Sequence, residues 1–458
     1  MTLPNTEARK TRRILLGIYG AALLYFVLKL VYYALGVGGF PDSTAQVSYL
    51  IEMSRAPALI PDFANMPMYN VLSRDGLSWI MEAMPGVINY MGHPPLYYLL
   101  MSLTGAVRFL PEGTAAVDML RLYVANIALS SAAVVLAFRL GYRRLQGKSP
   151  VVHALFALAV TTLPELGYVG ASVNNDNLAF FALVLFFTGV VRYDEDKQDL
   201  KTYLLIGIGF LLGSFSKLTM ALIMIFMLVT ILIMSVIRTK SLKLIANKYF
   251  LISLPCYGLF LAYELLIHRR FGGWQPSLAL VAPEYYLTTV YYVAPENRVP
   301  MTFLQFVRSF AGGIGYSWSS LYGHNKAATA QMNNMQAGVI FWIPVAGTAL
   351  AALLQLIRKQ KADRYTIPVF AAFLLTMAYH LYSNWSGYLK SGYMGGAQAR
   401  YYLPLIVPFA LIFCERIPTM FRTKKAKTVG TVLAILLVIM WLAGDAPRML
   451  VTLGFSPV

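Results

Sequence analysis

Long apolar blocks alternate along the chain with short polar segments, and many blocks are close to the roughly 20 residues that cross a bilayer as a helix. This pattern predicts an all-α polytopic membrane protein with about 11 (10–13) transmembrane helices. We place them at 14–36, 118–141, 151–171, a return span after residue 175, two helices within 202–237, and 249–268, 336–357, 366–384, 402–415 and 428–445.

Two segments need interpretation beyond hydropathy. Block 202–237 is too long for one helix and is interrupted at "SFSKLT", so it predicts a hairpin. The stretch 94–110 is short for a span and contains Arg108, so we predict an interfacial helix, where Tyr and Arg are favourable. We expect the first span to stay as an anchor, because no small-residue cleavage site follows it.

Basic residues gather in alternate loops, which determines the predicted orientation. They precede the first span and recur in "RLGYRRLQGK", "RTKSLKLIANK", "RKQKADR" and "FRTKKAK". Lys and Arg mark cytoplasmic loops. We therefore predict one integral-membrane domain in a bacterial inner membrane, with a cytoplasmic N-terminus and periplasmic loops at 37–116 and 269–335.

Composition agrees with this class. Hydrophobic residues make up 58% of the 458 residues and charged residues 13%, against about 25% charged in soluble domains. The net charge of +18 is explained by the loops, so no nucleic-acid partner is expected. Cys256 and Cys414 both lie in predicted spans, which argues against a disulfide or a cysteine metal cluster.

Asp42 follows the first span and precedes the helical segment "STAQVSYLIEM". A carboxylate at this point suits a general base acting on an acceptor hydroxyl or amine. The alternative is an N-cap for the following helix, a role in which Asp is common. The sequence leaves both possibilities open.

Further polar candidates are predicted on the same side of the membrane as Asp42. His93 and Tyr97 come from "GHPPLYYLL", and Asn175 and Asp176 from "SVNNDNLAFF", where capping explains only one polar residue. Ionisable groups at membrane depth indicate function by default.

Two cations complete the candidate set. Lys217 lies at the tip of the predicted hairpin, and Arg400 precedes a span together with Tyr401. Arg grips phosphate through paired hydrogen bonds, whereas snorkelling or interfacial anchoring would account for either residue without a ligand. Taken together, the candidates favour a lipid-linked phosphate substrate.

The ordered motifs "FPDSTAQVSYL", "HPPLYYLL", "SVNNDNLAFF", "LLGSFSKLTMAL", "SFAGGIGYSW" and "QARYYLPLIVP" resemble the GT-C superfamily of integral-membrane glycosyltransferases. The likeness extends from about residue 13 to residue 410 and is closest to uncharacterised bacterial members. It implies a GT-C-type bundle with periplasmic juxtamembrane helices. It also implies inverting transfer of a single sugar from a polyprenyl-phosphate donor to a glycan, lipid or protein acceptor of the cell envelope.

Under this resemblance Asp42 is the catalytic base, and Lys217 and Arg400 bind the donor phosphate. The chain has Asp42-Ser43 where many relatives have Asp-Glu, so a metal site built on two adjacent acids is not indicated, and no cofactor is expected. The alternatives are a lipid-linked-sugar flippase or transporter, which needs a polar path through the membrane, and a non-catalytic partner in envelope assembly. His380 is the one mid-span candidate for such a path.

Overall fold

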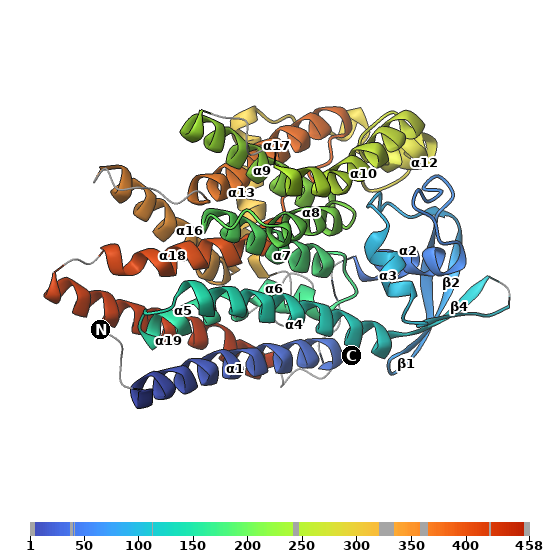
Figure 1. Cartoon of the computed structure of the whole chain (residues 1–458). Helices are drawn as coiled ribbons and strands as arrows, with labels where there is room; N and C mark the ends of the chain where they lie inside the picture. Colours follow the sequence, from blue (N-terminus) through green and yellow to red (C-terminus); the bar gives the residue numbers. More distant parts are fainter. Residues whose placement is uncertain are drawn as a thin grey trace.

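The computed structural model describes residues 5–36, 40, 42–111, 113–240, 247–319, 334–357, 365–420 and 423–452. Long helices run side by side, and a small sheet with several short helices lies at one end of the bundle (Figure 1). We call this end the sheet end.

The long helices correspond in position to the predicted spans. Their bounds are α1 (Asn5–Gly36), α4 (Met119–Arg144), α5 (Pro150–Thr161), α6 (Pro164–Ala171), α7 (Asp176–Asp194), α8 (Leu200–Ser214), α9 (Leu218–Thr239), α10 (Lys248–Phe271), α16 (Asn334–Ile357), α17 (Thr366–Ser391), α18 (Ile406–Met420) and α19 (Lys424–Thr452).

Within the described residues, seven helices are long and apolar enough to cross a membrane, or eight if α5 and α6 form one bent span. Three helices fall short: α8 and residues Gly338–Leu354 of α16 are shorter apolar helices, and α18 has only 15 residues. The chain is therefore a multi-pass membrane protein, but the expected count of about eleven spans is not confirmed.

Two helix breaks follow from local sequence. α5 and α6 meet at an angle of 52°, because Pro164 has no N–H to continue the helix and disfavours the α conformation of the residue before it. The predicted hairpin in 202–237 is confirmed: α8 ends at Ser214 and α9 begins at Leu218, with Lys217 in an extended conformation between them.

Segment 37–116 corrects the all-α prediction. Besides α2 (Ser43–Arg55) and α3 (Leu96–Ser102), it holds most of an antiparallel sheet of β1 (Pro67–Asp75), β2 (Ser78–Ile88), β3 (Val107–Phe109) and β4 (Thr114–Asp118), in the order β1-β2-β4-β3. The expected interfacial helix at 94–110 is α3 alone, and Arg108 lies in β3. β4 leads directly into α4, which places the sheet at the end of the bundle.

The described part of segment 269–335 adds α11 (Leu278–Val281), α12 (Pro283–Leu287), η1 (Pro295–Asn297), α13 (Phe303–Tyr316) and η2 (Ser317–Ser319). It packs closely on segment 37–116. A Cβ at Gly92 would lie 2.2 Å from the carbonyl oxygen of Pro276, so this approach requires glycine. We expect the polar motif "YGHNKAATAQMNN" of this segment to help determine the sugar and the acceptor, but apart from Asn334 it lies outside the described residues.

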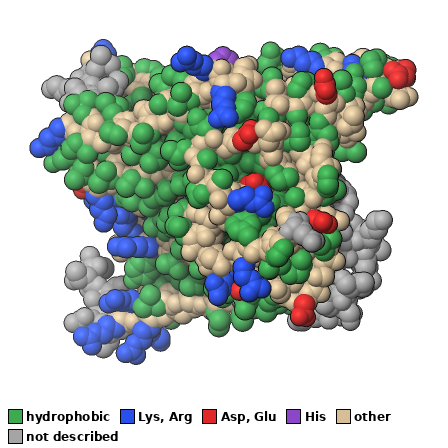
Figure 2. All heavy atoms as spheres, turned by 90° about the vertical axis from the view of Figure 1, so that its right-hand side faces the viewer, with side chains coloured by type: hydrophobic (Ala, Val, Ile, Leu, Met, Phe, Trp, Pro, Cys, Tyr) green, Lys and Arg blue, Asp and Glu red, His purple; other side chains and the backbone are tan. Residues whose placement is uncertain are grey.

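Two polar networks hold the bundle together. At the end opposite the sheet, Arg144 of α4 forms ion pairs with Glu195 and Glu415. Inside the bundle, Lys29 of α1 pairs with Asp445 of α19 at 2.7 Å, and both side chains are fully buried. Figure 2 views the sheet end, where hydrophobic side chains are mixed with backbone and uncharged polar atoms and acidic and basic side chains are scattered among them.

Candidate active site

Asp42 occupies the N-cap position of α2, yet its side chain does not cap the helix. Its backbone is left-handed, with φ 55°, and its side chain makes no capping hydrogen bond. Tyr90 instead donates to Oδ1 at 2.7 Å, and Arg400 donates from Nη2 to Oδ2. Left-handed non-glycine residues are uncommon, although Asp is among those that tolerate this conformation best. The alternative that the Asp42 carboxylate serves as a helix cap is therefore wrong, although Asp42 does stand at the N-cap position.

Arg400 lies in η3 (Ala399–Leu405), the short helix before α18. Arg400 is 8% exposed to solvent, and its Nε and Nη1 atoms have no hydrogen-bond acceptor among the described residues. Nη2 donates to Oδ2 of Asp42. A buried guanidinium with free N–H groups is costly unless an anion completes it.

Lys217 and Asp176 form a second buried ion pair. The start of α7 is fixed to the turn between α8 and α9 by two hydrogen bonds: Asn175 Nδ2 donates to the Ser216 carbonyl oxygen at 3.0 Å, and Ser216 Oγ donates to the Asn175 carbonyl oxygen at 2.8 Å. The Lys217 ammonium also lies 4.7 Å from the ring centroid of Tyr401. Tyr401 therefore lies beside both cations, since the Arg400 guanidinium is 5.9 Å from the same ring.

His93 lies near enough to both ion pairs to interact electrostatically with all four of their residues. It precedes α3, whose first N–H, that of Leu96, donates to the Phe215 carbonyl oxygen at 3.2 Å in the α8–α9 turn. Burial, together with the positive charges of Lys217 and Arg400, lowers the pKa of His93 to about 4. The imidazole is therefore neutral at pH 7, and its Nδ1 has no partner in the described part of the chain.

The electrostatics keep Asp42 ionised. Burial alone would raise its pKa, but the Arg400 charge and the hydrogen bonds from Arg400 and Tyr90 hold the pKa below its usual range. The cluster thus contains two carboxylates, two cations and a neutral imidazole. Its free polar atoms include Nε and Nη1 of Arg400, which are donors suited to a phosphate oxygen.

The structure brings six of the eight predicted site residues together: Asp42, His93, Asp176, Lys217, Arg400 and Tyr401. Tyr97 is fully buried, and its hydroxyl donates to Oδ1 of Asn126 at 2.8 Å rather than to a charged side chain. The Asn175 side chain donates a hydrogen bond to the Ser216 carbonyl oxygen and so holds the α8–α9 turn. Tyr90 is a site residue that the sequence interpretation missed, and its only signal is its place three residues before His93.

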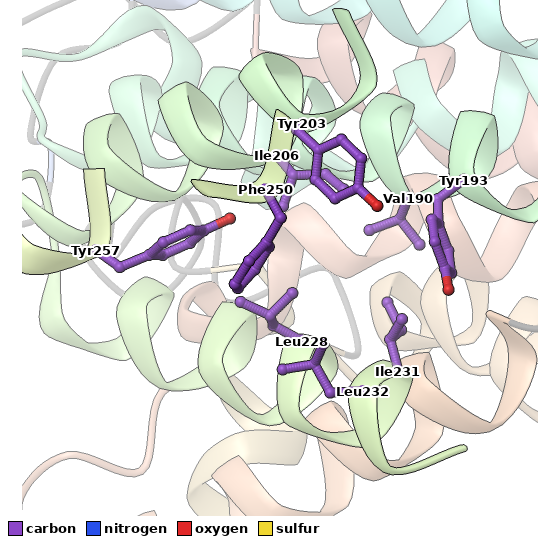
Figure 3. A pocket seen from close by; sticks show the side chains of 9 residues that line it. All are labelled: Val190, Tyr193, Tyr203, Ile206, Leu228, Ile231, Leu232, Phe250 and Tyr257. Carbon is purple, nitrogen blue, oxygen red and sulfur yellow. The ribbon is translucent and has the colours of Figure 1, made fainter. Parts of the chain in front are cut away.

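Neither a metal site nor the small cavity inside the bundle belongs to this cluster in the described part of the chain. Among the described residues, no group of three or more His, Cys, Asp or Glu side chains could hold a metal ion. An apolar cavity of about 20 Å³ lies between α7, α8, α9 and α10 (Figure 3). Hydrophobic and tyrosine side chains line it, and it has room for about one water molecule. It is not suited to a charged sugar donor.

Solved structures with a similar arrangement are distant in sequence. The Archaeoglobus fulgidus oligosaccharyltransferase in complex with Zn and sulfate is 13% identical, with a TM-score of 0.49 over 93% of this chain and 53% of that chain. ArnT from Cupriavidus metallidurans bound to undecaprenyl phosphate is 11% identical, with a TM-score of 0.38 over 94% of this chain and 77% of that chain. This chain thus spans about half the length of the oligosaccharyltransferase.

A search of the curated proteins gives no match. The sequence does match a family profile over residues 70–409, a range that contains all of the predicted site residues except Asp42. The chain therefore belongs to the family described as "Predicted membrane protein (DUF2142)".

Proposed function

We propose that this chain is a membrane glycosyltransferase that moves a single sugar from a polyprenyl-phosphate donor to an acceptor of the cell envelope. The observation that carries the proposal is the pairing of Asp42 with Arg400, whose remaining N–H groups are buried and unsatisfied within the described residues. The candidate base, Asp42, is thus in direct contact with Arg400, which still has N–H groups available to bind an anion. The resemblance of the ordered motifs to the GT-C superfamily supports the same reaction.

In the proposed reaction, Asp42 accepts the proton of an acceptor hydroxyl. The acceptor oxygen forms a bond to the anomeric carbon as the bond from that carbon to the phosphate oxygen breaks. The electron pair leaves with the polyprenyl phosphate, whose charge is stabilised by Arg400 and Lys217. Attack opposite the leaving group inverts the anomeric configuration.

The Asp42–Arg400 pair also suggests how the donor activates the base. A carboxylate with a lowered pKa accepts a proton poorly, and the Arg400 charge lowers the pKa of Asp42. A donor phosphate that draws Arg400 to itself would weaken this pair and raise the pKa of Asp42. Donor binding would then prepare the base for the acceptor.

His93 and Asp176 have supporting roles in this scheme. The neutral His93 lies among the charges without adding a third cation, and its ring can hydrogen-bond to a sugar hydroxyl or phosphate oxygen. Asp176 holds the Lys217 ammonium in place by its ion pair. The sheet end would face the periplasm, because the basic loops lie at the opposite ends of the helices that border it.

The proposal is tested with the full chain in nanodiscs and a panel of short-chain polyprenyl-phosphate sugars. Release of polyprenyl phosphate, the product common to transfer and hydrolysis, should occur with at least one sugar. In sealed proteoliposomes the same lipids should not change leaflet faster than in protein-free vesicles. Rapid flux without release of polyprenyl phosphate would instead support a flippase. Neither activity on any donor would favour a non-catalytic partner.

A further inference from the structure

A pocket of about 470 Å³ opens beside Asp42 at the sheet end. It lies between the start of α2, the sheet and the start of α4, and its volume falls within the usual range for small-molecule sites, about 300–1,000 Å³. Asp42 and Tyr90 both line it, whereas Arg400 does not. The other lining residues are Phe40, Ser43, Thr44, Ala45, Met68, Arg74, Trp79 and Tyr123.

The position of this pocket separates two approaches to Asp42. Oδ2 is bound by Arg400, whose free N–H groups define the anion site. Oδ1 is bound by Tyr90, which is a wall of the pocket. A molecule in the pocket would reach the carboxylate without passing the two cations of the donor site.

Arg74 gives the pocket its chemical preference. It pairs with Trp79 across β1 and β2, and its guanidinium lies 4.7 Å from the Trp79 ring centroid. Trp79 is 8% exposed, so it is a fixed support. Stacking on an aromatic face leaves the N–H groups at the edge of a guanidinium free to bind an anion. Among the ion pairs of the described residues, none involves Arg74.

The remaining walls suit a sugar ring. Phe40, Tyr90 and Tyr123 contribute aromatic surface, against which the C–H faces of a sugar can pack. Ser43 and Thr44 contribute hydroxyls that can donate or accept hydrogen bonds. A carboxylate base at one wall and a cation at another select a ligand with a hydroxyl and a negative charge.

We propose that this pocket binds the acceptor and that the acceptor is an anionic glycan, whose carboxylate or phosphate group pairs with Arg74. The inference rests on the proposed function, because it assigns the acceptor of that reaction. The hydroxyl to be glycosylated lies against Asp42, which takes its proton, and the anionic group remains on Arg74 throughout the transfer. A neutral glycan would leave Arg74 without a partner and bind more weakly.

Binding of three matched probes to the full chain in nanodiscs tests this proposal without any need for catalysis. The probes are methyl β-glucuronide, methyl β-glucoside 6-phosphate and the neutral methyl β-glucoside, followed by saturation-transfer NMR. At least one anionic probe should bind about tenfold or more tightly than the neutral one, as expected for a charge-assisted contact. The preferred probe distinguishes a carboxylate from a phosphate on the natural acceptor.

Variants then assign the preference to one residue. Arg74→Ala should abolish it and Arg74→Lys should keep part of it, whereas Arg108→Ala, an exposed arginine of β3 outside the pocket, should leave it unchanged. Equal binding of all three probes, or a preference that survives Arg74→Ala, would overturn this inference while donor turnover still stands. Anion preference in a protein that never releases polyprenyl phosphate would overturn the proposed function instead.

Discussion

Arg400 and Asp42 lie 358 positions apart in the chain, and the Nη2 group of Arg400 donates a hydrogen bond to Oδ2 of Asp42. The contact joins the first segment after α1 to the short helix η3 before α18. It explains why Asp42 leaves α2 uncapped, since its carboxylate is committed to Arg400 and Tyr90. Under the proposed function, the same contact couples binding of the donor phosphate to the pKa of Asp42.

The first prediction concerns Arg400 and pH. The Arg400 charge lowers the pKa of Asp42, so Arg400→Ala should raise it. Because Asp42 must be ionised to act as a base, the acid limb of the kcat/KM profile should move to higher pH in the variant. Arg400→Lys retains the charge and should lie between the two. An acid limb that stays in place would show that Arg400 does not act on the base.

The same pair predicts how stability changes with pH. Asp42 has a folded-state pKa below its unfolded value, so its contribution is present above the unfolded pKa and is lost as pH falls through the folded pKa. Thermal unfolding in detergent should therefore lose less stability on acidification in Asp42→Asn than in the wild type. Identical acid dependence would contradict a stabilising role for the pair.

Tyr90→Phe removes the hydroxyl that donates to Asp42 at 2.7 Å. A hydrogen bond to a charged group contributes about 1.5–3 kcal/mol, so turnover should fall about ten- to a hundredfold if the bond orients the base. Tyr69→Phe is a matched control, because Tyr69 donates to Glu52 at 2.6 Å in the same segment. A similar loss in both variants would point to a general defect of the sheet end.

The Lys29–Asp445 pair predicts a stability effect apart from the site. Both side chains are fully buried, so Lys29→Met alone leaves a buried carboxylate without its cation and should cost about 3–5 kcal/mol. The double variant with Asp445→Leu should recover much of this loss. Chemical or thermal unfolding in detergent measures the cycle, and additive losses in the double variant would rule out coupling between the two residues.

Orientation can be tested by labelling single cysteines in a Cys256→Ser, Cys414→Ala background. We predict that an impermeant maleimide reaches Ser73→Cys in β1 of intact spheroplasts and misses Gln146→Cys in the loop after α4. Both wild-type side chains are exposed at these positions. Labelling in the reverse order would place the sheet end in the cytoplasm and exclude a periplasmic active site.

The helices could be predicted because hydropathy acts locally: apolar blocks gave α4 and α10 close to their observed bounds and the end of α1 at Gly36, although α1 begins earlier than predicted, at Asn5. The sheet could not be predicted in this way. β3 spans only Val107–Phe109, which is too short for an alternating hydrophobic pattern to reveal its pairing with β4. Short strands beside amphipathic segments are easily interpreted as interfacial helix.

For the candidate site, too, the individual residues could be predicted from the sequence but their contacts could not. Charge at the ends of apolar blocks identified Asp42, Asp176, Lys217 and Arg400, because ionisable groups are rare there. Their pairing was not predictable, since it depends on how α7, the α8–α9 turn and η3 pack together. Tyr90 was missed for this reason: a tyrosine in a loop is unremarkable until the fold brings it to Asp42.

The central claim is that Asp42 is the base of a glycosyl transfer, and turnover of the Asp42→Asn variant tests it most directly. The change keeps the size of the side chain and removes its proton acceptor, and general-base catalysis contributes about 10²–10⁴-fold. Release of polyprenyl phosphate from an active donor should therefore fall at least about a hundredfold. Asp62→Asn, an exposed carboxylate in the same segment, should remain near wild type. Turnover near wild type by a folded Asp42→Asn protein would contradict the account.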